Sequence, residues 1–247
     1  MTNTLDDYSL LLIAVSFLVS ALGAFTALML SRHIATEDGN IRVGWLGLAG
    51  LVMGGCTIWA MHFIGMLAYK PDAPVTYDTQ MTLLSLVLPV LFTTAGLYVV
   101  NRFHGTAAWL VAGTVMGLGV AAMHYTGMAA MRIPAAMSHD QTLVGVSIAI
   151  AIAASIAALR IAVHWRGNLR HASSLVMAFA VCGMHYTAMA AMRLQPSGAT
   201  PDYFADALTR PVISIAVTLA VVSVAMIAII CLVGRQLDDV PGSEMRT

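Results

Sequence analysis

Residues 122–132 read AMHYTGMAAMR and residues 183–193 read GMHYTAMAAMR, so one eleven-residue phrase occurs twice with two differences. A looser third copy, WAMHFIGMLAY, occupies residues 59–69. The copies place His62, His124 and His185 at intervals of 62 and 61 residues. Such an interval holds two membrane-crossing helices and their loops, because one crossing takes about 20 residues. The repeat unit is therefore predicted to be a helical hairpin.

The composition is that of an integral membrane protein. Of the 247 residues, 59% are hydrophobic and only 10% are charged, and the mean hydropathy is +0.83. The predicted spans cover residues 9–31, 43–68, 80–100, 107–131, 142–163, 172–192 and 211–234. We therefore expect an all-α membrane protein with seven transmembrane helices, built from three pseudo-symmetric helical-hairpin repeats plus one C-terminal helix. Residues 1–235 are expected to form this membrane domain, and residues 236–247 a short cytoplasmic tail.

The distribution of basic residues predicts the orientation of the chain in an inner membrane. The formal net charge is zero and no basic block is present, which argues against nucleic-acid binding. Lys and Arg are more frequent in the loops on one side, which by the positive-inside rule is cytoplasmic. That side carries Arg32, Arg42, Arg102, Arg160, Arg166, Arg170, Arg235 and Arg246, against Lys70, Arg132, Arg193 and Arg210 on the other. The N-terminus is thus expected outside and the C-terminus inside, with the first span retained.

An aspartate stands at the opening of each odd-numbered span that begins a hairpin. Asp7, Asp78 and Asp140 occupy these positions. Asp is a preferred N-cap residue, so helix capping is the first interpretation, and support of a metal site from behind its ligands is the alternative. Arg132 and Arg193 follow the repeated phrase at a span end, where their side chains are expected to reach the outer surface.

The three histidines are expected to meet near the outer leaflet. The even-numbered spans all run in the same direction, so their histidines lie at matching depths and converge if the hairpins pack around a pseudo-threefold axis. Positions i and i+4 share one helix face. A methionine recurs at that offset after each histidine, and another directly before it. These residues are Met66, Met128 and Met189 after, and Met61, Met123 and Met184 before.

The ligand types favour a soft metal. Imidazole suits zinc, copper and iron, whereas a thioether favours Cu(I), so methionine in every repeat favours copper over zinc. No Asp or Glu lies mid-span, which argues against magnesium or calcium. Cys182 shares the face of His185, and Cys56 and Cys231 also lie within spans, so no disulfide framework is expected. The remaining histidines match no repeat position and are expected to be solvated: His33, His104, His139, His164 and His171.

The phrase resembles the signature of the MHYT domain family of bacterial integral membrane sensors. The signature is complete at residues 123–126 and 184–187, whereas the first copy reads Met61, His62, Phe63, Ile64. The resemblance covers nearly the whole chain and implies sensing of a diatomic gas such as O2, CO or NO through a bound metal, usually suggested to be copper. The implied ligands are Met61, His62, Met123, His124, Met184 and His185, with Met66, Met128 and Met189 also recurring. Phe63 replaces a tyrosine, so a role that requires three phenols does not extend to this chain.

Three functions follow from these observations, and a fourth is set aside. The first is a sensory membrane module that binds copper and a gas and signals to a separate cytoplasmic partner, since only about a dozen residues follow the last span. The second is a haem- or metal-dependent membrane redox enzyme, in which His and Met bind the haem iron. The third is copper transport or storage, which would need ligands staged along a path, whereas these ligands are gathered at one depth. A retinal-type receptor is set aside because Lys70 is the only lysine and lies at a span end.

Overall fold

The computed structural model describes residues 7–71, 73–164, 172–196 and 207–238. Within them, seven helices are long and apolar enough to cross a membrane, which confirms the predicted spans to within a few residues. The second span is continuous over Val43–Ala68 and consists of α2 (Val43–Leu51), the π-helix η2 (Val52–Ala60) and α3 (Met61–Ala68). The others are α1 (Leu10–Ser31), α4 (Thr79–Arg102), α5 (Thr106–Ala129), α6 (Gln141–His164), α7 (Ala172–Ala191) and α8 (Arg210–Asp238).

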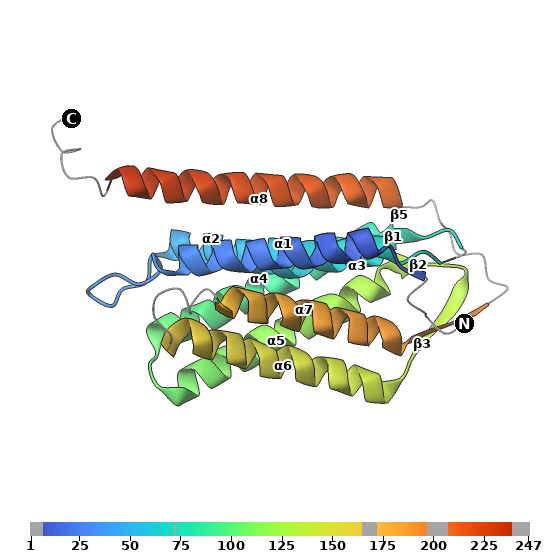
Figure 1. The fold of residues 1–247 in the computed structure, drawn as a ribbon, viewed down its shortest axis with the longest axis horizontal. Helices are drawn as coiled ribbons and strands as arrows, with labels where there is room; N and C mark the ends of the chain where they lie inside the picture. The colour runs from blue at the N-terminus through green and yellow to red at the C-terminus, as the bar shows by residue number, and fades with distance from the viewer. Residues whose placement is uncertain (1–6, 72, 165–171, 197–206, 239–247) are drawn as a thin grey trace.

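Six of these helices form three hairpins that close into a ring. The hairpins are α1 with the second span, α4 with α5, and α6 with α7, and each packs against the next: η2 against α4, α5 against α6, and α7 against α1. The second helix of each hairpin lies inside. In the three hairpins, 83%, 56% and 61% of the most apolar stretch of this helix is buried, against 28% for each first helix. The seventh span, α8, lies outside the ring, against η2, α3 and α1 (Figure 1). The phrase-bearing helices therefore surround the axis.

Small residues set the distance between neighbouring hairpins. A β-carbon on Gly54 would lie 2.5 Å from the backbone nitrogen of Val90 in α4, and one on Gly117 would lie 2.5 Å from the α-carbon of Ile152 in α6. The corresponding residue of the third repeat, Ala178, is fully buried. Backbones in contact at this distance exclude larger side chains, as is usual between membrane helices.

The π-helix accommodates one extra residue in the first repeat. A Val-Met pair followed by Gly or Ala recurs in all three inner helices, but Met53 stands nine residues before His62, whereas Met116 stands eight before His124. The third repeat matches the second. A π-helical stretch absorbs such an insertion within a helix, because it places more residues in each turn. The interval from Met53 to His62 is therefore one residue longer than in the other repeats, while both residues keep the orientation of their counterparts in α5 and α7.

Short strands cover one end of the bundle, the end at which the repeated phrase stops (Figure 1). The central strand β1 (Thr76–Asp78) pairs antiparallel with β2 (Met131–Arg132) and β5 (Ala207–Thr209). A second antiparallel pair joins β3 (Ala135–His139) to β4 (Met192–Pro196). These strands satisfy backbone groups at the helix ends, and the sequence did not predict them.

Two of the three aspartates at the hairpin openings, Asp78 and Asp140, cap helices and pair with arginine, whereas the N-cap residue of α1 is Ser9 and not Asp7. The Asp78 carboxylate accepts a hydrogen bond from the Met81 amide at 2.9 Å and forms an ion pair with Arg132. Asp140 accepts from the Thr142 amide at 3.0 Å and from Arg193 at 3.4 Å. The capping interpretation is confirmed for both residues. Support of a metal site is the wrong interpretation for them, because these carboxylates face arginines at the surface.

The insertion in η2 generates a deletion test. We predict that deleting Gly55 is tolerated, since the shortened segment can revert to the α-helical spacing of the other repeats. Deleting Leu118 from α5, at a comparable distance before its histidine, should prevent folding, because it rotates His124 by about 100° relative to Gly117. Size-exclusion chromatography and thermal unfolding in detergent measure both outcomes. Equal loss of folded protein from the two deletions would contradict this explanation of the π-helix.

The Asp78 cap generates a pH test. The Met81 amide, and then the Arg132 guanidinium, hold the pKa of Asp78 below its ordinary value. This stabilisation is therefore present above about pH 4, the ordinary pKa of an aspartate, and is lost as the pH falls through the lowered value. We predict that Asp78→Ala lowers the free energy of unfolding by about 0.5–2 kcal/mol at neutral pH. Asp78→Asn should lower the free energy of unfolding less and make it depend less on pH. Unfolding of the wild type and both variants is measured from pH 7 to pH 3, and identical pH profiles for the three proteins would contradict the prediction.

Candidate metal centre

His62, His124 and His185 converge on the axis of the bundle, as predicted. They come from α3, α5 and α7, five or six residues before these helices end. The Nδ1 atoms of His62 and His185 lie 3.1 Å apart, and each lies 3.2 Å from Nδ1 of His124. All three side chains are fully buried, and the rings stand nearly perpendicular to one another at 81–88°. Among the described residues, this is the only group of three His, Cys, Asp or Glu side chains with metal-ligand spacing.

Glycines make room for the outward edges of two rings. A β-carbon on Gly65 would lie 2.3 Å from Nε2 of His185, and one on Gly127 would lie 2.4 Å from Nε2 of His62. Each glycine stands three residues after the histidine of its own repeat, so one repeat provides space for the ring of another. The third repeat carries Ala188 at this position, and Ala188 is also buried. The arrangement therefore follows the pseudo-threefold repeat closely, with one substitution.

The nitrogen triangle fits a cation better than a set of hydrogen bonds. An imidazole nitrogen carries either a hydrogen or a lone pair in the ring plane, so three hydrogen bonds cannot close a triangle of Nδ1 atoms. With hydrogens on the Nε2 atoms, which are buried without a hydrogen-bond partner, three lone pairs face one point. A metal ion about 2.0–2.1 Å from each nitrogen fits over a triangle of these dimensions. The donor set is thus suited to a metal that accepts imidazole.

Tyrosines beside two of the histidines bind serines of the next hairpin. The Tyr125 hydroxyl lies 2.7 Å from Oγ of Ser147 in α6, and the Tyr186 hydroxyl lies 3.0 Å from Oγ of Ser16 in α1. Both serines are fully buried. A hydrogen bond between buried groups fixes the rotation of one helix against another, because breaking it leaves two unsatisfied polar atoms. Hydrogen bonding between neighbouring hairpins therefore accounts for these tyrosines.

The first repeat replaces the missing phenol with an indole. Phe63 follows His62 and has no hydroxyl group, but Trp59, one turn earlier, donates from Nε1 to Oγ of Ser85 in α4 at 3.2 Å. Ser85 is fully buried and corresponds to the serines that bind the two tyrosines. Sequence reasoning missed this serine set, although each member follows a hairpin-opening aspartate by seven to nine residues. All three inner helices are thus held by one aromatic-to-serine bond each.

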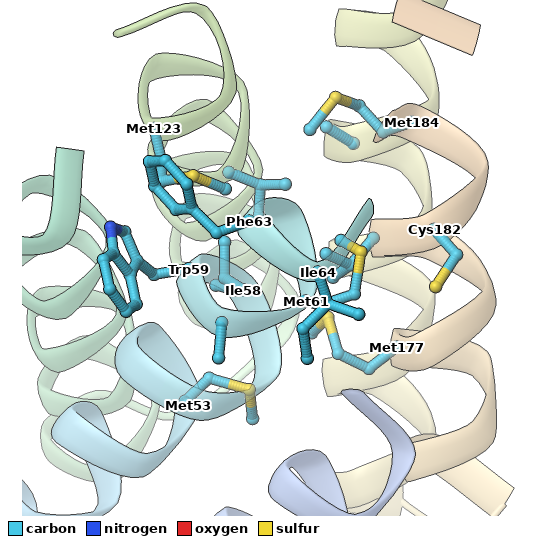
Figure 2. Packing of buried hydrophobic residues seen from close by; sticks show 14 of the residues in the cluster. Met53, Ile58, Trp59, Met61, Phe63, Ile64, Met123, Met177, Cys182 and Met184 are labelled. Atoms are coloured by element: carbon cyan, nitrogen blue, oxygen red, sulfur yellow. The ribbon is translucent and has the colours of Figure 1, made fainter. Parts of the chain in front are cut away.

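The six methionines proposed as ligands are all buried. The three that precede the histidines are fully buried and come from three different inner helices, as Figure 2 shows for Met61, Met123 and Met184. The other three, which each stand four positions after a histidine, are buried to a similar degree: Met66, Met128 and Met189. Burial agrees with packing and with ligation alike, so thioether ligation remains a prediction.

The cysteines do not join the histidine group. Cys182 is buried beside Ser16 of α1, and Figure 2 shows its side chain pointing away from the neighbouring methionines. Cys56 is buried and free as well, as predicted from the absence of a disulfide pattern. Cys231 lies in α8. The metal-ligand group among the described side chains therefore contains histidine alone.

Two histidines that were expected to be solvated, His139 and His33, are half-buried. His139 was expected to be solvated, but it lies half-buried in β3, its ring 6.2 Å from that of Tyr125 and its Nε2 buried without a partner. The strand pairing of β3 with β4, which the sequence did not predict, brings it there. His33 is half-buried against Trp45, with ring centres 4.7 Å apart, whereas His104 is exposed as expected. The side chains of His164 and His171 lie outside the described residues.

Comparison with known proteins identifies relatives among bacterial signalling proteins. The bifunctional diguanylate cyclase/cyclic di-GMP phosphodiesterase MucR of Pseudomonas aeruginosa is 38% identical over 237 residues, which cover 90% of this chain and 34% of MucR. The cyclic di-GMP phosphodiesterase NbdA of the same organism is 37% identical over 203 residues, 78% of this chain and 26% of NbdA. The signalling protein YkoW of Bacillus subtilis is 34% identical, over 78% of this chain and 25% of YkoW.

This chain thus spans between a quarter and about a third of the length of these relatives. No solved structure matches it. The family model described as a bacterial signalling protein N-terminal repeat, MHYT, matches residues 55–113 and 117–174. Those residues include two of the three copies of the phrase, together with α4 and α6, in a bundle of seven apolar helices. The chain therefore belongs to the MHYT family.

Proposed function

We propose that this chain is a signalling domain that binds one copper ion through His62, His124 and His185 and responds to a diatomic gas at that ion. The observation that carries the proposal is the triangle of three buried Nδ1 atoms, each within 3.2 Å of the other two. Copper bound there supplies redox activity and an affinity for O2, CO or NO. Three protein nitrogens leave a further coordination position for such a ligand, as in metal sites that keep an open position.

Copper is favoured over zinc and over haem. Buried methionines at fixed offsets from every histidine supply soft sulfur, which suits Cu(I) more than zinc. A haem bound by two of these histidines would hold their nitrogens on opposite sides of its ring, roughly 4 Å apart from twice a metal–nitrogen bond of about 2 Å. The Nδ1 atoms are closer than this and three in number, so the geometry favours a single ion. Zinc is the alternative that the three imidazoles alone also suit.

The surroundings of the histidines favour an apolar gas as the stimulus. The centre lies within an apolar bundle whose outer surface faces lipid, and diatomic gases dissolve readily in lipid. With the N-terminus outside, as the loop charges predict, the centre lies near the outer face of the inner membrane. The ring of aromatic-to-serine bonds then links the position of each phrase-bearing helix to the adjacent hairpin.

The output is proposed from the relatives. MucR and NbdA are named as enzymes of cyclic di-GMP synthesis or breakdown, and the matched segment is about a third or less of their length. We therefore infer that this domain controls a cytoplasmic signalling partner, with cyclic di-GMP enzymes as the first class to test. In this proposal the chain's own residues bind the ion and shift the hairpins, and the partner carries out any catalysis.

Metal content gives the direct test of the centre. We predict that His124→Ala lowers the copper bound at the histidine centre by at least about tenfold in affinity, since loss of a group that merely supports a ligand already costs about 10–100-fold. His104→Ala is the matched control, because His104 is exposed and lies far from the converging set in the sequence. Elemental analysis of both variants purified in detergent measures the effect. Equal copper in the two would place the metal elsewhere.

The role of sulfur is tested by replacing Met128 and Met189 together with Leu. Volume and apolarity stay nearly constant, and such swaps usually cost less than about 1.5 kcal/mol, so folding should survive. If the thioethers are ligands, affinity for Cu(I) should fall more than affinity for Zn(II), because imidazole alone serves zinc well. Competition titrations of both ions on the two proteins give the comparison. Unchanged Cu(I) binding would make these methionines packing residues and leave Met61, Met123 and Met184 as sulfur candidates.

A further inference from the structure

A second set of three methionines lies at a different depth in the same bundle. Met53, Met116 and Met177 come from η2, α5 and α7, and each follows the valine of the recurring Val-Met pair. They stand nine, eight and eight residues before the three histidines, and the π-helix absorbs the one-residue difference. At the usual helical rise, this set lies about 12 Å from the histidine centre, on the side away from the strands. The repeat therefore generates two layers of equivalent side chains.

All three methionines line one cavity of about 170 Å³. All six ring helices contribute to its wall, so it lies at the centre of the bundle. The methionines are 8%, 1% and 3% exposed, and in Figure 2 Met177 extends from α7 toward the helix that carries Met53. Polar groups lie in the last or first turns of α1, α4 and α7, at the far end of the cavity. They are Ser31, Asn101, Ser173 and Ser174.

The wall chemistry suits a soft monovalent ion. Within the cavity lining there is no acid, base or histidine, so divalent hard cations and anions find no compensating charge. Three thioethers are soft ligands that select Cu(I). Methionine is also the usual side chain for filling irregular gaps, yet here three of them border a space larger than the roughly 30 Å³ share of one water molecule. Packing alone therefore explains this layer incompletely.

We propose that Met53, Met116 and Met177 form a second metal site, which binds Cu(I) through three thioethers. It is separate from the histidine centre and goes beyond the proposed sensory function. Buried aliphatic side chains one turn before each histidine lie between the two layers: Ile58, Val120 and Val181. Ions therefore reach the methionine site from the end of the bundle that carries the serines and Asn101, without passing the histidines.

The second site also bears on copper transport or storage. The sequence places the ligands of the repeated phrase at one depth, which argues against transport along a path of staged ligands. With a methionine layer and a histidine layer about 12 Å apart, the chain has soft ligands at two depths. The aliphatic layer between them separates the sites, so storage of two ions fits this arrangement better than a continuous path.

The test is a Cu(I) titration of the full chain in detergent, under reducing conditions and with a chromogenic Cu(I) chelator as competitor. His124→Ala weakens the histidine centre, so the one Cu(I) ion that still binds tightly to each chain of this variant reports the methionine site. This bound ion is called the tight equivalent. Adding Met53→Leu, Met116→Leu and Met177→Leu should abolish that equivalent. The control adds Met81→Leu and Met226→Leu, both exposed methionines, and should retain it. X-ray absorption on the His124→Ala variant should show copper bound to sulfur only.

The outcomes separate this proposal from the proposed function. Retention of the tight equivalent in the triple-leucine variant overturns the methionine site, whatever the histidines bind. Loss of the tight equivalent only in the triple-leucine variant supports the methionine site. If His124→Ala alone also leaves total bound copper unchanged, the histidine centre is contradicted. If the triple variant does not elute as a monodisperse peak, Met116→Leu alone is used. It should weaken Cu(I) binding at least about tenfold, and an unchanged affinity overturns the site.

Discussion

The close approach of three imidazoles on the bundle axis is the constraint on which the rest of the structure depends. Nδ1 atoms 3.1–3.2 Å apart require three helices at one depth with one rotation. The three helices must run in the same direction to place their histidines at one depth. Between two such helices another span has to bring the chain back across the membrane, which explains the hairpin repeat. The glycines follow as well, because Gly65 and Gly127 leave room for rings that any side chain would displace. Serine bonds to Tyr125 and Tyr186 then fix the rotation of their helices.

Departures from threefold symmetry are concentrated in the first repeat. It contains the π-helix with its extra residue, and it has Phe63 in place of a tyrosine, with Trp59 making the bond to serine instead. α8 packs against η2, α3 and α1, all parts of this same hairpin. A repeat unit that also accepts an additional helix has a different surface to bury from its two counterparts. The first hairpin is therefore the one through which a change at His62 reaches the final span directly.

The sequence predicted the repeat, the spans and the meeting of the histidines, because hydropathy and the 61- and 62-residue spacing depend only on chain length and helix geometry. It did not predict η2, because the extra residue shows only when Met53 is aligned with Met116. The position of His139 depends on pairing between β3 and β4, residues far apart in the chain whose strands are short. The sequence offers Trp59 as a hydrogen-bonding residue beside Tyr125 and Tyr186, but it does not identify Ser85 as the partner, since the indole stands one turn before the position of the tyrosines.

The histidine triangle also links stability to ligand binding. A buried polar atom without a partner costs about 1–3 kcal/mol, and here three Nε2 atoms are in that state while the three Nδ1 atoms lie within 3.2 Å of one another. The packing of the glycine contacts and the serine bonds must offset this cost in the absence of an ion. An ion that binds only the folded chain adds about 2.7 kcal/mol of stability at a hundred times its dissociation constant. Occupancy of the centre and tight closure of the three hairpins are thus expected to rise together, which gives a bound ion a physical means of changing the arrangement of the helices.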